Sequence, residues 1–157
     1  MSTAIEKPVL PIDLERIVVG DSASLEWTVT NSQIDAFAEF SRDDNPLHMQ
    51  DTFATQLGFP GRVAHGMVTL SAISRLIGTQ LPGPGALWMS QEVHFAAPVF
   101  VDDTIEAKVT VQSVSKSARV IVLSTEAINQ QSKQIVLRGT AKVRVPEGLP
   151  ARISDQG

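Results

Sequence analysis

The sequence predicts an α+β fold in which one antiparallel sheet of about five strands wraps around a single long buried helix. Two observations lead to this prediction. Residues 68–81 are apolar on nearly every side of a helix, which is typical of a helix enclosed by protein. One segment before this helix and four segments after it carry the alternating or continuous apolar patterns of strands.

The first half of the chain supplies one strand and two short helices. In residues 24–30, "SLEWTVT", apolar and polar residues alternate as they do in a half-buried strand. Residues 31–42 carry a capping pattern and an apolar face, which together predict a short helix. A second short helix is expected within residues 51–61, because Gly58 provides a C-terminal cap and a Pro-Gly turn follows it.

The second half of the chain is predicted to be almost entirely strand. The four expected strands cover residues 91–99, 104–114, 119–128 and 134–145. Short connections between consecutive strands indicate antiparallel pairing. Such a sheet covers the helix on one side only and keeps open edges, and both features indicate a homodimer.

Length and composition are those of one globular domain, with 157 residues of which 43% are hydrophobic and 19% charged. We expect a lead-in over residues 1–23, the folded domain over 24–146 and a tail over 147–157. The net charge of −4 argues against nucleic-acid partners, and no stretch approaches a membrane span. The chain has no cysteine and its first residues lack a signal-peptide pattern, so we expect a cytoplasmic protein.

One loop, "FSRDDNPLHMQDTFA" at residues 40–54, places carboxylates close to an imidazole. Asp43 and His48 lie five residues apart across an Asn-Pro pair. Proline fixes its own φ and pushes the preceding residue out of the helical region, so the loop should be stiff, as a positioned acid–base pair requires. The alternative is an ordinary turn with a surface histidine, and the spacing alone favours that alternative.

A metal site is a further alternative for this loop. Asp43, Asp44 and His48 offer oxygen and nitrogen ligands, and His65 is the only other histidine at a comparable sequence distance. A catalytic zinc takes about three firm protein ligands at a recognisable spacing. We therefore expect no metal at this loop.

The segment "AHGM", residues 64–67, opens the predicted buried helix. Gly66 would let a substrate approach the backbone, where the N–H groups of the first helical turn could hold negative charge on a carbonyl oxygen. Close packing of this glycine against a strand is the alternative. His65 is ambiguous, because histidines at helix starts are more often structural than catalytic. Arg42 and Arg62 flank the two motifs and could contact an anionic ligand.

The two motifs together resemble the MaoC-like hydratases and dehydratases, close to the (R)-specific enoyl-CoA hydratases of hot-dog fold. The residues that match the family's loop motif are Phe37, Ser41, Asp43, Asn45, Pro46, Leu47, His48 and Ala54, and "HGM" begins seventeen residues after His48. Two positions depart from the motif, because Phe40 stands where a smaller aliphatic residue is usual and Arg42 replaces a glycine. The resemblance spans roughly Trp27 to Val145.

The resemblance implies a reversible syn hydration of a trans-2-enoyl thioester to an (R)-3-hydroxyacyl thioester, without a cofactor. Asp43 and His48 would bind one water molecule and move its protons, and the N–H of Gly66 would polarise the thioester carbonyl. Asn45 would brace the loop. A serine near the position of Ser74 lines the site in the family, so we expect Ser74 to do the same.

Coenzyme A is the expected carrier of the acyl group. An acyl carrier protein is the alternative carrier, and Arg42 with Arg62 could give it a basic rim. Two functions of other kinds stay open for the same fold. A hot-dog thioesterase would hydrolyse the same ligands without needing the paired Asp43 and His48, and a non-catalytic acyl-binding domain would lose that pair.

Overall fold

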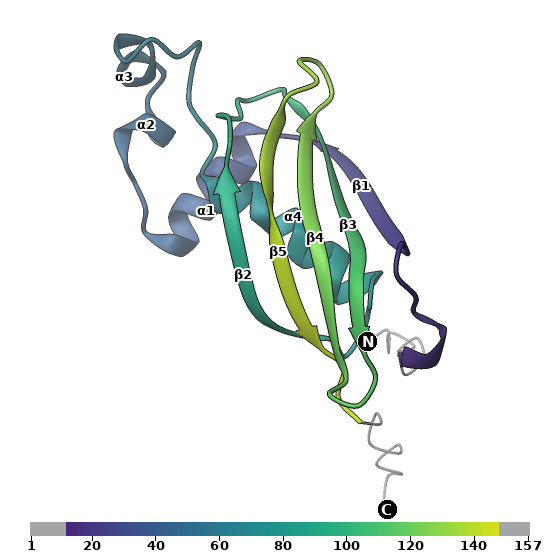
Figure 1. Ribbon diagram of the computed structural model, residues 1–157. Helices are drawn as coiled ribbons and strands as arrows, with labels where there is room; N and C mark the ends of the chain where they lie inside the picture. The colour runs from purple at the N-terminus through teal and green to yellow at the C-terminus, as the bar shows by residue number, and fades with distance from the viewer. Residues whose placement is uncertain (1–11, 148–157) are drawn as a thin grey trace, which may run out of the picture.

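The computed structural model describes residues 12–147 and confirms the predicted α+β architecture (Figure 1). Five antiparallel strands form one sheet in the order β1-β3-β4-β5-β2, and helix α4 lies across its inner face, which is the hot-dog arrangement. The strands are β1 Ser22–Thr28, β2 Leu87–Phe95, β3 Thr104–Ser115, β4 Val120–Asn129 and β5 Ile135–Arg144. Most of the predicted lead-in and tail, residues 1–11 and 148–157, lies outside the described residues.

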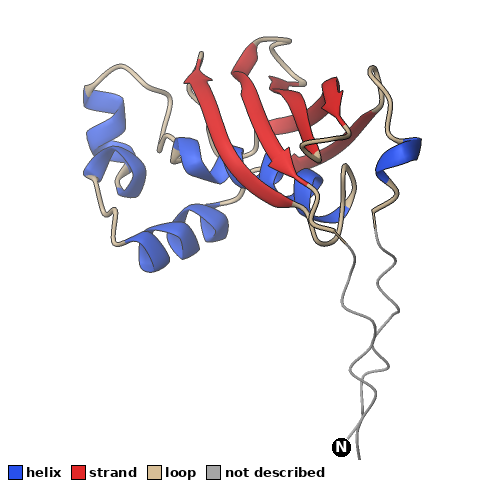
Figure 2. Ribbon diagram, turned by 60° about the horizontal axis from the view of Figure 1, so that its bottom comes forward, coloured by secondary structure: helices blue, strands red, loops and turns tan. Residues whose placement is uncertain are grey.

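The helices connect β1 to β2. They are α1 Asn31–Ser41, α2 Pro46–Met49, α3 Asp51–Gln56 and α4 Gly66–Thr79, and a short 3-10 turn, η1 Leu14–Arg16, precedes β1. Helices α1 to α3 gather on one side of the sheet, and α2 and α3 stand beyond its β2 edge (Figures 1 and 2). Within residues 12–147, no helix combines the length and the apolarity that crossing a membrane requires.

The core lies between the sheet and α4. Alternate residues of β3, β4 and β5 point inward and are fully buried, among them Ile105, Val109, Ile121, Leu123 and Val143. Helix α4 packs its own buried side chains, Leu70, Ile73, Leu76 and Ile77, against them. Each side chain of this size stabilises the fold by about 1.5–3 kcal/mol when it leaves water.

One side of α4 stays uncovered in the single chain. Met67, Ser71, Ser74 and Arg75 are exposed there, opposite the residues that face the sheet. The helix is therefore covered by the sheet on one side only, as the sequence predicted.

The pairing of β2 differs from the expected succession of hairpins. The chain makes hairpins from β3 to β4 and from β4 to β5, but β2 pairs with β5, and residues 96–103 then cross to β3 on the other side of the sheet. This connection is not a tight turn. It contacts the segment before α4, where the N–H of Ala64 donates to the carbonyl of Val99 at 2.7 Å. The prediction of a hairpin here was wrong, because turn-like composition does not determine which strand is the partner.

Gly139 of β5 allows a close approach of the paired strand β2. A Cβ at this position would lie 2.0 Å from the carbonyl oxygen of Glu92, a backbone atom held in the β2–β5 ladder. We therefore expect Gly139→Ala to lower the free energy of unfolding by about 1–3 kcal/mol, as overpacking does elsewhere. Urea denaturation followed by circular dichroism measures this difference.

The matched control is Gly78→Ala in α4, where an added Cβ would meet nothing within 4 Å. Alanine is the better helix former, so this variant should be more stable than the parent chain by about 0.5–1 kcal/mol. Unchanged stability in Gly139→Ala would contradict the register described for β2 and β5.

Candidate active site

The loop after α1 is held by short-range hydrogen bonds. Asn45 caps α2, because its side-chain oxygen accepts the N–H of Leu47 at 3.0 Å. Pro46 occupies the first helical position, where its missing N–H loses no helical hydrogen bond. Before the cap, the hydroxyl of Ser41 accepts the N–H of Asp43 at 3.1 Å. The loop therefore has the defined conformation that the Asn-Pro pair predicted.

Asp43, His48 and His65 come together at one place. One carboxylate oxygen or ring nitrogen from each residue lies within 4.8 Å of the other two. The rings of His48 and His65 stack with their centroids 3.9 Å apart and their planes inclined by 32°. Asp43 and His48 thus face a common site and do not point to separate surfaces. We call these three residues the Asp-His-His cluster.

Two backbone carbonyls determine which ring nitrogens carry protons in this cluster. Nδ1 of His48 lies 2.7 Å from the carbonyl oxygen of Val63, and Nε2 of His65 lies 2.9 Å from the carbonyl oxygen of Asp43. A carbonyl oxygen can only accept a hydrogen bond, so each of these nitrogens donates. In the neutral rings, Nε2 of His48 and Nδ1 of His65 therefore hold the lone pairs.

His65 is the most buried member of the cluster. Its side chain is 2% exposed, and its ring packs against those of both His48 and Phe37, with the Phe37 centroid 4.8 Å away. Its Nδ1 has no hydrogen-bond partner among the described residues. His65 therefore supports both the backbone of Asp43 and the ring face of His48.

The cluster contains metal-ligand types, but its geometry suits a metal ion poorly. A catalytic zinc takes about three firm protein ligands, and the carboxylate that would be the third ligand here, that of Asp43, is about half exposed. In addition, Nδ1 of His48 and Nε2 of His65 are already bonded to carbonyl oxygens. The absence of a metal stays a prediction that this geometry favours.

Gly66 is the first residue of α4, directly after the cluster residue His65. The N–H groups of a first helical turn have no partner within the helix, and they lie at the positive end of its dipole. Gly66 and His48 line the same cavity of about 390 Å³ beside β2. The ring of Phe95 packs over Gly66, so that a Cβ there would lie 2.8 Å from the nearest ring atom. Gly66 is therefore both closely packed and next to the cavity.

Arg62 connects the loop that carries His48 to helix α1 through hydrogen bonds and an ion pair. Its guanidinium donates to the carbonyl oxygen of His48 and to the side-chain oxygen of Asn31, and it forms an ion pair with Asp35. Its backbone N–H donates to Asp51 at 2.9 Å. The side chain is only 11% exposed. Most of its donors are therefore used within the protein.

Comparisons with known proteins give the same family as the motifs. Residues 20–132 match the family model described as MaoC like domain. The (R)-specific enoyl-CoA hydratase of Rhodospirillum rubrum is 39% identical over 84% of this chain and 90% of its own length. The chain belongs to the MaoC-like family.

Other members of the family agree in fold and extent. The solved structure of an (R)-hydratase from A. caviae has a TM-score of 0.80 and 34% identity, and the match covers 84% of this chain and 99% of that one. A mitochondrial 3-hydroxyacyl-[acyl-carrier-protein] dehydratase of Arabidopsis thaliana is 32% identical over 82% of this chain and 77% of its own length. Enzymes named for coenzyme A and for carrier-protein substrates therefore both occur among the relatives.

Arg42 replaces the glycine of the family motif in a conformation that glycine favours. It ends α1 in the left-handed region with φ 63°, and its exposed side chain has no hydrogen-bond or ion-pair partner among the described residues. Ser74 lies on the uncovered side of α4 and does not line the cavity of His48 and Gly66. The substrate contacts expected of Arg42 and Ser74 stay predictions.

The sequence did not predict the contacts of two aromatic residues of the site. Phe37 was noted only as part of the loop motif, yet its ring packs on His65. Phe95 was noted only as part of a strand, yet its ring packs over Gly66. His65 itself stood beside a recognised glycine, but nothing in the sequence placed it against His48.

The role of Arg62 can be tested through stability. Arg62→Gln removes the charge and the bonds to Asp35 and to the loop carbonyl, so we expect the free energy of unfolding to fall by about 1–3 kcal/mol. The control Arg42→Gln changes an exposed side chain and should stay within about 0.5 kcal/mol of the parent chain. Equal stability of the two variants in urea denaturation would contradict the structural role of Arg62. The ligand contact that the sequence suggested for its guanidinium would then be the better explanation.

Proposed function

We propose that this chain is a hydro-lyase that reversibly adds water to trans-2-enoyl thioesters to give (R)-3-hydroxyacyl thioesters. The observation that carries this proposal is the convergence of Asp43 and His48 on one site, with His48 and Gly66 lining a common cavity. The names of the relatives in Rhodospirillum rubrum and A. caviae support the reaction type and the (R) configuration.

The helix start activates the substrate. The thioester carbonyl oxygen accepts a hydrogen bond from the N–H of Gly66, at the positive end of the α4 dipole. This contact draws electrons from the conjugated double bond and makes C3 electrophilic. When a C3–O bond forms, the π electrons move toward C2 and the carbonyl oxygen, and the same N–H holds the enolate-like charge.

The Asp-His-His cluster supplies the water and moves its protons. The carboxylate of Asp43 and the lone pair on Nε2 of His48 are acceptors for the two hydrogens of one water molecule. As the water oxygen attacks C3, the carboxylate takes one proton. The same proton then passes from the Asp43 carboxyl group to C2 while Nε2 of the neighbouring imidazole accepts a hydrogen bond from the new hydroxyl, so that H and OH are added, the carboxylate is regenerated and no electrons are exchanged. Both transfers occur from one face, which makes the addition syn.

The other site residues have supporting roles in this proposal. Asn45 fixes the start of α2, as its capping bond indicates. Arg62 positions the backbone of His48, and this role takes the place of the direct substrate contact that the sequence suggested. Arg42 contacts the anionic part of the carrier, and Ser74 lines the acyl path from α4.

A homodimer is part of the proposal. Strand β2 is an edge of the sheet. It carries three large apolar side chains that are half exposed, Leu87 at 56%, Met89 at 54% and Phe95 at 50%. Met67 of α4 is 51% exposed. A second copy that paired along β2 would cover these side chains and the open edge together.

Coenzyme A is the carrier we propose, and an acyl carrier protein is the alternative. Comparing the turnover of an enoyl group bound to each carrier distinguishes the two. The exposed cation of Arg42 beside Asp43 suits the phosphates of either carrier. The expected cytoplasmic location stays a prediction from composition.

Removing either acid–base group should abolish most of the activity. We expect Asp43→Asn and His48→Ala each to lower kcat by ~10²–10⁴-fold, because each removes a proton acceptor from the water. Hydration of crotonyl-CoA, followed by the loss of enoyl absorbance and by chiral analysis of the product, measures this. The control Arg138→Gln changes an exposed side chain on the outer face of β5 and should keep full activity.

Near-full activity in Asp43→Asn or His48→Ala would contradict the mechanism. Release of free thiol with no loss of the double bond would identify a thioesterase. If the parent chain turned over no enoyl thioester, the remaining interpretation would be a non-catalytic acyl-binding domain.

The two interpretations of Gly66 can be separated with a double variant. Gly66→Ala should lower kcat/KM by about 10²-fold, because the methyl group obstructs the approach of the carbonyl to the backbone N–H. It also displaces the ring of Phe95, but that ring is half exposed and can move, so the fold should persist. Adding Phe95→Leu relieves the contact with the ring. If activity returned in Gly66→Ala/Phe95→Leu, close packing would explain the glycine and the carbonyl contact would be wrong.

A further inference from the structure

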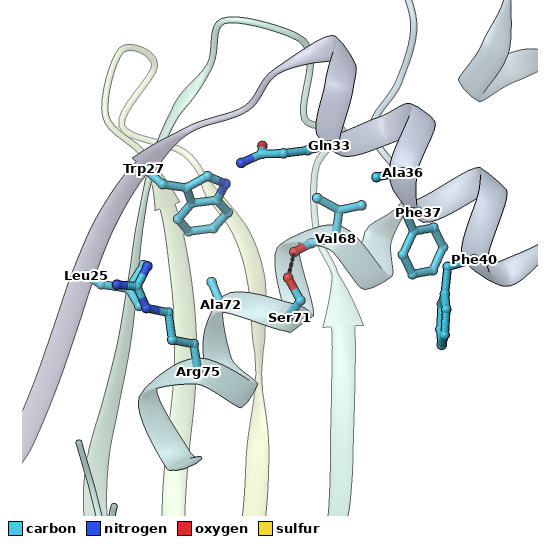
Figure 3. A pocket seen from close by; sticks show the side chains of 10 residues that line it. All are labelled: Leu25, Trp27, Gln33, Ala36, Phe37, Phe40, Val68, Ser71, Ala72 and Arg75. Atoms are coloured by element: carbon cyan, nitrogen blue, oxygen red, sulfur yellow. Dashed lines mark hydrogen bonds between the residues drawn. The ribbon is translucent and has the colours of Figure 1, made fainter. Parts of the chain in front are cut away.

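A second hollow lies on the opposite flank of α4 and has no part in the proposed hydration. It has a volume of about 410 Å³ and is bounded by β1, α1 and α4 (Figure 3). It shares no lining residue with the cavity of His48 and Gly66. We call it the α1–α4 groove. Its walls are largely apolar, and the large side chains among them are Leu25, Trp27, Phe37, Phe40 and Val68.

One cation stands at one end of the α1–α4 groove. The side chain of Arg75 extends away from α4 toward Leu25 of β1 (Figure 3). Among residues 12–147, no carboxylate lies within ion-pair distance of its guanidinium. Arg75 follows Val68 by seven residues on the same side of the helix, so the groove runs along roughly 10 Å of α4.

The other polar groups of the groove are partly occupied within the protein. The hydroxyl of Ser71 donates to the carbonyl of Val68 at 2.6 Å. The side-chain oxygen of Gln33 accepts the N–H of Thr30 at 3.1 Å. The groove therefore offers a ligand an apolar channel with one unpaired positive charge at its end.

We propose that the α1–α4 groove binds a linear medium-chain carboxylate. The alkyl chain lies on the apolar walls between α1 and α4, and the carboxylate pairs with the guanidinium of Arg75. The volume falls within the range of small-molecule pockets, and an apolar channel with a single cation complements a chain with a single anionic end. This inference does not rest on the proposed hydration, because Phe37, which packs on His65, is the only residue of the groove that also contacts the Asp-His-His cluster among the contacts described above.

Trp27 provides a direct probe of the groove. The chain has two tryptophans, so Trp88→Phe leaves Trp27 as the only one. In this background, titration with decanoate below its micelle concentration should shift the Trp27 emission to shorter wavelengths in a saturable manner, because the alkyl chain displaces water from the indole. Calorimetry on the same protein should give a stoichiometry of one decanoate per chain.

Two variants test the placement of the ligand. Ala36 is an exposed residue of α1 that lines the groove, and Ala36→Phe fills the channel, so it should weaken decanoate binding at least tenfold. Arg75→Gln should weaken it about two- to fivefold, the range of an exposed ion pair, while binding of neutral decanol stays unchanged. The matched control is Arg138→Gln on the outer face of β5, which should bind decanoate as the parent chain does.

Three results would overturn the proposal. The first is the absence of a saturable change, and the second is decanoate binding that persists unweakened in Ala36→Phe. The third is a lower oligomeric mass of Ala36→Phe in sedimentation, which would show that a second copy of the chain covers the groove. Circular dichroism confirms folding of each variant, and hydration of crotonyl-CoA is measured separately, so a failure of one proposal is not mistaken for a failure of the other.

Discussion

The site depends on two hydrogen bonds that join the loop after α1 to the segment before α4. In one, Nδ1 of His48 donates to the carbonyl of Val63, and in the other, Nε2 of His65 donates to the carbonyl of Asp43. Each bond uses a histidine from one segment and a backbone carbonyl from the other. Together they hold Asp43 and His48, the proposed acid–base pair, next to the helix start, and they leave the lone pair on Nε2 of His48 available for the water molecule of the proposed reaction. Each bond therefore fixes the position of a histidine ring and determines which of its two nitrogens carries the proton in the neutral form.

The fold provides the support that these bonds require. Helix α4 is fixed by its buried side against the sheet, so its first turn is a rigid reference for the loop. Arg62 holds the other side of the loop to α1 through an ion pair and side-chain hydrogen bonds. The proposed acid–base pair lies on an exposed loop and thus has three attachments to rigid elements. Arg42, by contrast, adopts a conformation that costs a non-glycine residue about 1 kcal/mol, and no described contact of its side chain offsets that cost.

Local patterns in the sequence predicted the elements, whereas the spacing of Asp43 and His48 alone favoured an ordinary turn, and the proposal that they form an acid–base pair came from the family motif. The alternating pattern of β1, β3, β4 and β5 and the apolar run of α4 can be recognised from residues that are close together in the sequence. The Asn-Pro pair likewise predicted the stiff loop. The strand pairing that was predicted wrongly and the contacts that were not predicted are non-local. Which strand pairs with β2 depends on the packing of the whole sheet. His65 packs on His48, and the guanidinium of Arg62 bonds to α1. Both contacts join segments that are far apart in the sequence, and the spacing of residues along the chain does not predict that such segments meet.

The central claim is that one water molecule, held by Asp43 and His48 on a single face of the substrate, supplies both groups that are added. The most direct test is hydration of crotonyl-CoA in D₂O, with the configuration at C2 and C3 of the product determined by NMR. We predict deuterium at C2 on the same face as the new hydroxyl at C3, which has the (R) configuration. Deuterium on the opposite face, or a mixture of the two faces at early times, would contradict the arrangement described for these two residues.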